Sequence, residues 1–209
     1  MLNPAFRLLK VFLQAPSKEL YGRQMERLAG INHERAISYQ NKLANDYKAL
    51  IKEKKGKQVF YHVNKRSEIA QKALSIAELE RKIEFISKNK RGAAIQSLVS
   101  EMVEIAGTSV YFVVLFGSMA RGQSRESSDI DLLFVLLEKG KTQSKLDDFA
   151  RRMVIATPEK IAFNSITLRE LEKQWHKEPI YRNIWEERIV LFGEQNFWQF
   201  VLKEGEPYG

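Results

Sequence analysis

Two aspartates in the middle of the chain have the spacing of a metal-binding pair. The stretch Gly117–Leu133 reads GSMARGQSRESSDIDLL and separates the apolar run VYFVVLF from FVLLE. Asp129 and Asp131 are two residues apart at the start of the second run, so in a strand both carboxylates face the same side. Neighbouring carboxylates repel each other, and a divalent cation relieves that repulsion. The pair therefore predicts a Mg²⁺ site.

The residues at the start of the same stretch predict a phosphate site. Gly117 allows a sharp turn and a close approach of a ligand to the backbone. Ser118 precedes a short helix expected from Met119 to about Arg121, where its hydroxyl and unpaired backbone N–H groups can bind an anion. Arg121 adds positive charge nearby. With the two carboxylates, these residues predict a site that presents a metal-bound nucleotide for phosphoryl transfer.

The order of these residues resembles the nucleotidyltransferase motif of the DNA polymerase beta superfamily, and most closely its minimal bacterial and archaeal members. The resemblance extends over about 108–193. It implies that Gly117 and Ser118 bind the nucleoside triphosphate (NTP) and that Asp129 and Asp131 hold catalytic Mg²⁺. It places Arg121 near the phosphates or in a structural role.

The resemblance also implies a third carboxylate on a later strand, expected at 160–166. Asn164 and Ser165 stand there in place of an acid, and Glu159 and Glu170 lie to either side as substitutes of unassigned register. Two interpretations stay open. The first is a Mg²⁺-dependent enzyme that moves a nucleoside monophosphate from an NTP to an unidentified acceptor hydroxyl. The second is a nucleotide-binding transcription regulator with little or no turnover.

The elements that must position this site form a C-terminal domain, expected over 93–209. The apolar runs 110–116 and 130–137 predict two buried strands on either side of the motif. Later strands are expected at 160–166 and 189–193. The fold class predicted is α+β and multidomain, with a mixed sheet of few strands in this nucleotidyltransferase-like domain.

The N-terminal third is basic and predicts a nucleic-acid-binding module. Residues 1–66 contain 14 Lys and Arg against 5 Asp and Glu, whereas the rest of the chain contains 20 against 21. Helices are expected from Pro4, over 18–29 and over 32–50, followed by a hairpin that turns at Lys55-Gly56-Lys57. This order resembles a winged helix-turn-helix domain. Charge concentrated in one module favours a polyanion as its partner.

By that resemblance, the helix at 32–50 enters the major groove of duplex DNA and the hairpin follows the phosphates. The residues assigned to DNA are Arg35, Ser38, Asn41, Lys42, Asn45, Lys54, Lys55 and Lys57. Ser and Asn suit base edges, while Arg and Lys suit phosphates. The alternative is a module of the same fold that binds protein.

A helical connector is expected over 67–92, between the two domains. Apolar residues within 66–91 repeat at heptad-like spacing, which fits either packing on the helix's own domain or a homodimer coil. The chain has no cysteine and no apolar run long enough to cross a membrane, so a cytoplasmic protein without a membrane partner is predicted. The three histidines are far apart in the sequence and predict no metal site.

Overall fold

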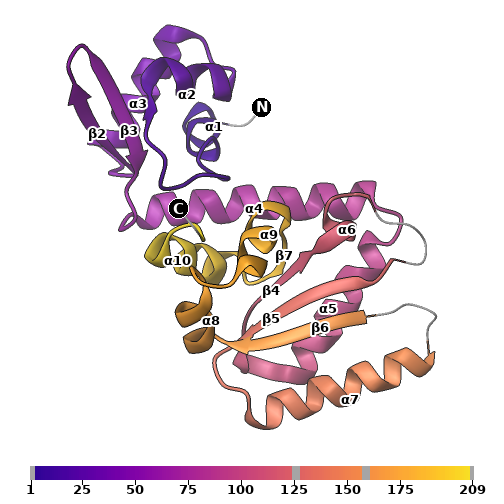
Figure 1. The fold of residues 1–209 in the computed structure, drawn as a ribbon. Helices are drawn as coiled ribbons and strands as arrows, with labels where there is room; N and C mark the ends of the chain where they lie inside the picture. Colours follow the sequence, from indigo (N-terminus) through magenta and orange to yellow (C-terminus); the bar gives the residue numbers. More distant parts are fainter. Residues whose placement is uncertain (1–2, 124–127, 157–160, 208–209) are drawn as a thin grey trace. The chain divides into compact units, whose positions relative to one another are not determined.

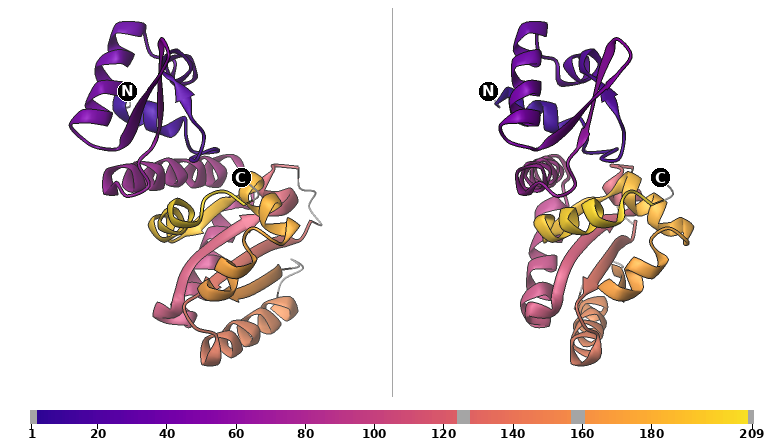
Figure 2. Two further views of the ribbon diagram at one scale, coloured as in Figure 1. Left: turned by 60° about the vertical axis from the view of Figure 1, so that its left-hand side comes forward. Right: turned by 90° about the vertical axis from the view of Figure 1, so that its left-hand side faces the viewer.

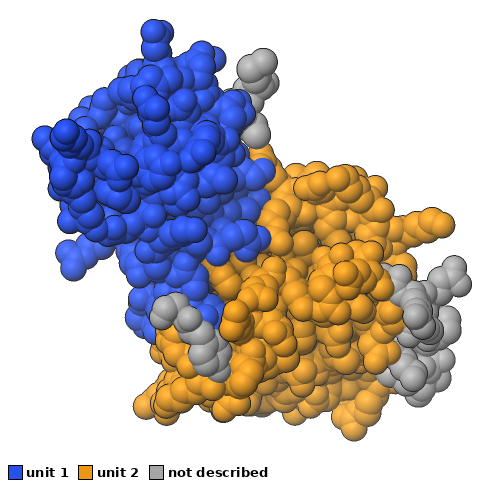
Figure 3. All heavy atoms as spheres, turned by 45° about the horizontal axis from the view of Figure 1, so that its top comes forward, with its two compact units in different colours: residues 1–77, 198–207, 209 blue, residues 78–197, 208 orange. Residues whose placement is uncertain are grey.

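The structure, a computed structural model, describes residues 3–123, 128–156 and 161–207. It divides into two compact units, which are coloured separately in Figure 3. Unit 1 comprises residues 1–77, 198–207 and 209, and unit 2 comprises residues 78–197 and 208. None of the helices in the described ranges is long and apolar enough to cross a membrane.

Unit 1 begins with three helices and a small antiparallel sheet (Figure 1). The helices are α1 (Pro4–Lys10), α2 (Gly22–Ala29) and α3 (His33–Asn45). The strands are β1 (Leu20–Tyr21), β2 (Leu50–Lys55) and β3 (Gln58–Val63), in the order β1-β3-β2. Asn3 and Asn32 cap α1 and α3, because their side chains accept hydrogen bonds from the first-turn N–H groups.

Helix α3 is shorter than the predicted 32–50. Lys48 has a φ of +50°, which lies in the left-handed region, and the N–H of Ala49 donates to the carbonyl of Leu43 at 2.8 Å. This reversal ends the helix and lets Leu50 begin β2, where it pairs with Val63. The periodicity missed the reversal because Leu50 is buried in either arrangement.

Unit 2 is built on a four-stranded mixed sheet in the order β6-β5-β4-β7. Its strands are β4 (Val110–Phe116), β5 (Ile130–Leu136), β6 (Ile161–Thr167) and β7 (Ile189–Phe192). Strands β5 and β6 are parallel, and the other pairs are antiparallel. This sheet confirms the α+β class with a mixed sheet in the C-terminal part of the chain.

Helices lie on both faces of this sheet, and Figure 2 shows α5 on one side and α8 on the other. They are α5 (Gly92–Ala106), α6 (Gly117–Ala120), α7 (Gly140–Ala156), α8 (Leu168–Gln174) and α9 (Pro179–Glu187), with a 3₁₀ turn at Gly107–Ser109. Two helices contain the points where the chain passes between units: α4 (Glu68–Lys88) and α10 (Glu194–Glu204).

The two faces of the sheet have different roles. The main core lies between one face and helices α5 and α7, with Val113, Leu132 and Phe134 contributed by the strands. Alternation places Asp131 on the opposite face, together with Phe112. Phe112 packs on Phe197 with ring centres 5.4 Å apart, and Phe197 stacks on Trp185 of α9 at 6.2 Å. Helix α9 therefore covers the face that carries Asp131.

Candidate nucleotide and metal site

Strand β5 carries the predicted carboxylate pair. Asp129 precedes the strand and is exposed, whereas Asp131 is half-buried and lies opposite Phe116 of β4. Burial raises the pKa of Asp131, and the negative charges of Asp129 and Glu187 raise it further, while Arg121 lowers it. The negative charge at this end of the strand is therefore only partly offset by the chain's own cations.

Gly117 lies directly against Asp131. Its φ is +75°, in the region that favours glycine, where β4 ends and α6 begins. A Cβ atom at this position would lie 2.3 Å from Oδ2 of Asp131. Glycine is thus required twice, by the backbone conformation and by the carboxylate. The sequence analysis predicted a close approach of a ligand here, and a carboxylate of the chain itself makes such an approach.

Glu187, which the sequence analysis missed, also belongs to this site. It is the last residue of α9. Its Oε2 accepts a hydrogen bond from the N–H of Gly117 at 2.8 Å, and its Oε1 forms a short ion pair with the guanidinium of Arg121. Gly117 and Arg121 are two of the groups that were predicted to bind phosphate. In the structure, one carboxylate binds both.

Strand pairing is the signal that could have identified Glu187. Strand β7 runs antiparallel to β4, with Ile189 opposite Leu115. Continuing this register by two residues places Glu187 opposite Gly117. The sequence predicted the strand at 189–193 but gave it no partner, because hydrophobic periodicity does not say which strands are neighbours.

Arg188 fixes the backbone next to Glu187. Its guanidinium lies 3.7 Å from the ring centre of Trp185 and 3.3 Å from Oε2 of Glu78, and the side chains of Arg188 and Glu78 are both 0% exposed. Its N–H also donates to the carbonyl of Ile184 at 2.9 Å. A buried pair of charges is favourable only in a well-defined geometry, so these contacts restrain the end of α9.

Strand β6 supplies no third carboxylate. Ala162 lies opposite Asp131, and Asn164 lies opposite Leu133, one step further along the same face. Ser165 points to the other face, because side chains alternate along a strand. The β6 position beside Asp131 is thus occupied by a methyl group, and Asn164, one of the two residues named in place of an acid, lies beside Leu133.

The two substitute acids named from the sequence do not reach the pair. Glu170 lies beyond the far end of β6, where it accepts hydrogen bonds from Thr167 and pairs with Lys139 at 2.9 Å. Those hydrogen bonds lower the pKa of Glu170 to about 2. Glu159 lies outside the described residues.

The donors at this site fit a divalent cation held by two carboxylates. Mg²⁺ commonly takes one or two protein carboxylates and completes its shell with water and phosphate. Burial is the main cause of the raised pKa of Asp131, and the negative charges of Asp129 and Glu187, which such an ion would offset, add to it. Glu187 does not form a three-carboxylate cluster with the aspartates. Among the described residues, the carboxylate oxygens of Asp129, Asp131 and Glu187 do not all lie within 4.8 Å of one another.

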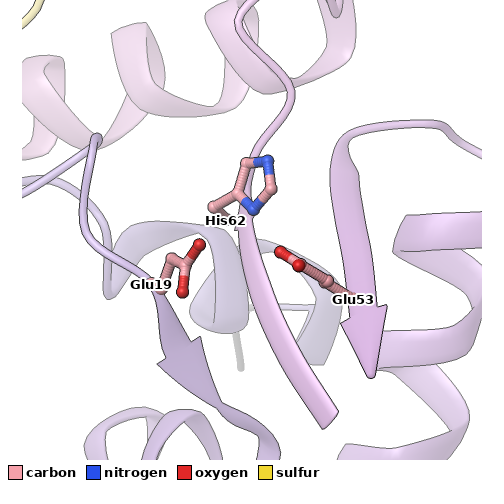
Figure 4. Close-up of side chains that lie close together, drawn as sticks. All are labelled: Glu19, Glu53 and His62. Carbon is pink, nitrogen blue, oxygen red and sulfur yellow. The ribbon is translucent and has the colours of Figure 1, made fainter. Parts of the chain in front are cut away.

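A different acidic group forms in unit 1, where Glu19, Glu53 and His62 approach one another (Figure 4). The ammonium of Lys55 lies 2.5 Å from Glu19 and 3.6 Å from Glu53. The hydrogen bond from Lys55 is the main cause of the lowered pKa of Glu19. A cation of the chain already offsets both carboxylates, so these residues form a surface ion-pair network and are not assigned to a metal.

The residues assigned to DNA lie on α3 and on the β2–β3 hairpin. Asn41 is half-buried and accepts a hydrogen bond from Lys52 at 2.9 Å, while Lys55 belongs to the ion-pair network. Helices α2 and α3 and the hairpin border a cavity of about 590 Å³. The exposed members of the set are Arg35, Ser38, Lys42, Asn45, Lys54, Lys55 and Lys57.

Comparison with known families identifies the domain that contains the site. Residues 101–197 match the family model described as Polymerase beta, Nucleotidyltransferase. The matched range contains Gly117, Asp129, Asp131 and Glu187. Residues 101–197 are therefore a polymerase-beta-like nucleotidyltransferase domain, and the prediction of a nucleotidyltransferase is confirmed for this domain. No curated protein matches the chain.

Two solved structures resemble part of the chain. One is a protein from Sulfolobus solfataricus provisionally described as a nucleotidyltransferase, with 18% identity over 54% of this chain and 84% of that one, and a TM-score of 0.32. The other is a toxin–antitoxin structure with AMP-PNP, with 13% identity over 52% of this chain and 83% of that one, and a TM-score of 0.37. Likenesses this weak say nothing about what this chain acts on.

Proposed function

We propose that the polymerase-beta-like nucleotidyltransferase domain transfers a nucleoside monophosphate from an NTP to an acceptor hydroxyl. The observation that supports this most directly is the arrangement of Asp129, Asp131 and Gly117, inside the matched range 101–197. Paired carboxylates beside a glycine turn are the groups that a metal-bound triphosphate needs.

In the proposed reaction, the acceptor oxygen forms a bond to the α-phosphorus while the bond to the bridging oxygen breaks. Pyrophosphate leaves, and the hydroxyl proton is released to solvent. Asp129 and Asp131 are the residues that would hold Mg²⁺, which neutralises charge on the phosphates. The N–H of Gly117, the hydroxyl of Ser118 and the guanidinium of Arg121 orient the triphosphate by donating hydrogen bonds to it.

The second candidate is a nucleotide-binding regulator with little or no turnover. It is favoured by β6, where Ala162 stands beside Asp131 and the sequence Ile161–Thr167 contains no acid. A site with two carboxylates can still bind a Mg²⁺–nucleotide complex, because Mg²⁺ needs few protein ligands. Binding without transfer would then serve as a signal to unit 1.

For unit 1 we infer a nucleic-acid-binding module of the winged helix-turn-helix type, with duplex DNA as its ligand. The support is the order of three helices and a hairpin, with exposed polar and basic residues on α3 and exposed Lys54 and Lys57 at the hairpin. These groups suit base edges and phosphates. The domain limits proposed remain 1–66, 67–92 and 93–209.

Helix α4 also supports the proposal of a homodimer. Ile69, Ile76, Leu79 and Ile83 are between 39% and 57% exposed, although they are large apolar side chains at heptad-like spacing. Burying them against the same helix of a second copy would remove apolar surface from water. Light scattering of the wild type and of an Ile76→Lys variant tests this, since a dimer built on α4 should dissociate in the variant.

Labelled nucleotides test the transfer reaction. The chain is incubated with each α-³²P-labelled NTP, Mg²⁺ and candidate acceptors, and Asp131→Asn is expected to lose label transfer by about 10²-fold or more. Asp148→Asn is the matched control, because Asp148 is exposed and pairs with Arg151 on the surface of α7. Nucleotide binding by the wild type with no label transferred to any acceptor would favour the regulator.

A further inference from the structure

The carboxylate of Glu187 is bound in the way that proteins bind phosphate. Each oxygen has its own donor: the backbone N–H of Gly117 for Oε2 and the guanidinium of Arg121 for Oε1. Only 18% of the Glu187 side chain is exposed, against 41% of Arg121. Arginine and backbone N–H groups are the usual donors to phosphate oxygens, and two oxygens of one phosphate can meet such donors together.

This contact leaves the donors occupied when no ligand is present. A phosphate group that accepts from the N–H of Gly117 must first replace Oε2 of Glu187, because a backbone amide has a single donor, and it competes with Oε1 for the Nη1 donor of Arg121. Replacement also takes the Glu187 carboxylate off Gly117, which lies directly against Asp131. The exchange therefore costs the charge-assisted hydrogen bonds that Glu187 makes, and the phosphate must make equivalent bonds to the same donors.

The chain restrains how this exchange can occur. The backbone next to Glu187 is held by Arg188, through its contacts with Trp185 and Glu78. The side chain of Glu187 can leave its donors by rotating about its own bonds, while α9 stays in place. After such a rotation, the carboxylate remains tethered close to the donors and can return to them.

We propose that Glu187 is an internal competitor for the phosphate donors of the site. It yields Gly117 and Arg121 to the incoming triphosphate and takes them back when pyrophosphate leaves. The proposal rests on the proposed function, because it assumes that these donors bind the phosphates of the nucleotide. In this proposal, Glu187 sets the affinity for the triphosphate and the release of pyrophosphate. It is not the third metal ligand that the family resemblance implied.

Pyrophosphate is the probe of choice, because its binding depends on neither the base nor the acceptor. Titration calorimetry with pyrophosphate and Mg²⁺ measures the dissociation constant of the wild type and of Glu187→Gln. A neutral amide competes weakly for Arg121 and repels phosphate less, so the variant is expected to bind roughly 10-fold more tightly, which is about 1.4 kcal/mol. Titrations with the four NTPs should shift in the same direction.

Glu186→Gln is the matched control. Glu186 is the preceding residue of α9, is exposed, and pairs with Arg182 on the surface at 3.0 Å. The substitution removes the same charge from the same helix and should leave the dissociation constant unchanged. Equal affinities of wild type and Glu187→Gln, or weaker binding by the variant, would overturn the proposal. So would a failure of both proteins to bind pyrophosphate or any NTP.

A second measurement tests directly the hydrogen bond between the N–H of Gly117 and Glu187. The chain has two Phe-Gly steps, Phe116-Gly117 and Phe192-Gly193. Labelling phenylalanine carbonyls with ¹³C and glycine nitrogens with ¹⁵N therefore isolates two amide signals. The Gly117 signal should move in ligand-free Glu187→Gln and, in the wild type, on addition of pyrophosphate, while Gly193 serves as the internal reference. An unmoved Gly117 signal in the variant would contradict the contact on which the proposal depends.

The outcomes separate this inference from the proposed function. Tighter pyrophosphate binding by Glu187→Gln supports the inference even if no acceptor is ever labelled, because binding does not require turnover. The converse result is label transfer that depends on Asp131 while Glu187→Gln binds pyrophosphate with unchanged affinity. That result would support the transferase and exclude Glu187 as an internal competitor. Thermal unfolding of both glutamine variants checks that each remains folded in these measurements.

Discussion

The N–H of Gly117 donates a hydrogen bond of 2.8 Å to the carboxylate of Glu187, although the two residues are 70 positions apart in the sequence. Antiparallel pairing of β4 and β7 creates this relationship, since Ile189 lies opposite Leu115. The same glycine touches Asp131 on its other side. One backbone position thus connects Asp131, which we propose holds metal, with Glu187, whose carboxylate binds the groups that we propose orient the phosphates.

Gly117→Ala should be severely damaging to the site. The new Cβ would lie 2.3 Å from Oδ2 of Asp131, and an alanine at a φ of +75° is strained by roughly 1–2 kcal/mol before any clash. We expect loss of label transfer by about 10²-fold or more, and a lower free energy of unfolding in urea. Gly122→Ala is the control: its φ is +69° and the Cβ atom of an alanine there would have no neighbour within 4 Å, so only the backbone cost applies. Equal effects of the two substitutions would rule out a special role for the Asp131 contact.

Arg188→Met should destabilise unit 2 strongly. The substitution removes the hydrogen-bonded partner of the buried Glu78 and leaves it, among the described residues, only the longer ion pair with Arg81 at 3.6 Å, and removing one partner of a buried pair costs about 3–5 kcal/mol. Urea unfolding measures the change in free energy. Arg182→Met is the control, because its ion pair with Glu186 is exposed and is worth about 1 kcal/mol or less. Adding Glu78→Leu to Arg188→Met should recover much of the stability, since the fully buried carboxylate is then gone and Arg81, which loses its own partner, is 21% exposed. A destabilisation by Arg188→Met as small as that of the control would contradict this account.

Glu170 should make the stability of the chain depend on pH in the acid range. Its pKa is about 2 in the folded chain against an ordinary 4.5, because Thr167 and Lys139 favour the charged form. A lowered folded pKa means that the contribution is complete above pH 4.5 and is lost as the pH falls toward 2. The difference in unfolding temperature between wild type and Glu170→Gln should therefore be constant near neutral pH and shrink below pH 4.5. A difference in unfolding temperature that grows on acidification would contradict a lowered pKa of Glu170 in the folded chain.

Binding of duplex DNA by the whole chain should depend steeply on salt. Lys54 and Lys57 are exposed at the hairpin. Each lysine–phosphate contact that a substitution removes should reduce the slope of log affinity against log salt by about 0.9. The double variant Lys54→Gln/Lys57→Gln should therefore bind with a slope smaller by about 2 in a fluorescence anisotropy titration. Lys72→Gln serves as the control, because Lys72 lies on α4 and pairs with Glu68. An unchanged slope in the double variant would place DNA binding elsewhere or exclude it.

Features that depend on residues close in the chain could be predicted from the sequence. The strand that begins at Ile130 and contains Asp131, and the glycine turn after the run 110–116, follow from local geometry and were correctly predicted, although Asp129 precedes the strand. Charge in residues 1–66 and the positions of most helices and strands were also readable, since side-chain periodicity and caps act within a few residues. The end of α3 was not, because a left-handed Lys48 leaves no signal in the hydrophobic pattern.

The groups that come together at the site from distant parts of the chain are set by how the strands pair in the fold. Strand register places Ala162 beside Asp131, so β6 provides no third acid, and it places Glu187 opposite Gly117. The same kind of pairing brings His62 to Glu19 and Glu53 in unit 1. Register is set by the packing of whole strands against their neighbours, and a shift of one residue would reverse every side chain. That information is absent from any short stretch, and for this reason Gly117 and Arg121 could be named from the sequence as candidate phosphate donors, whereas the carboxylate that binds them in the structure could not be found.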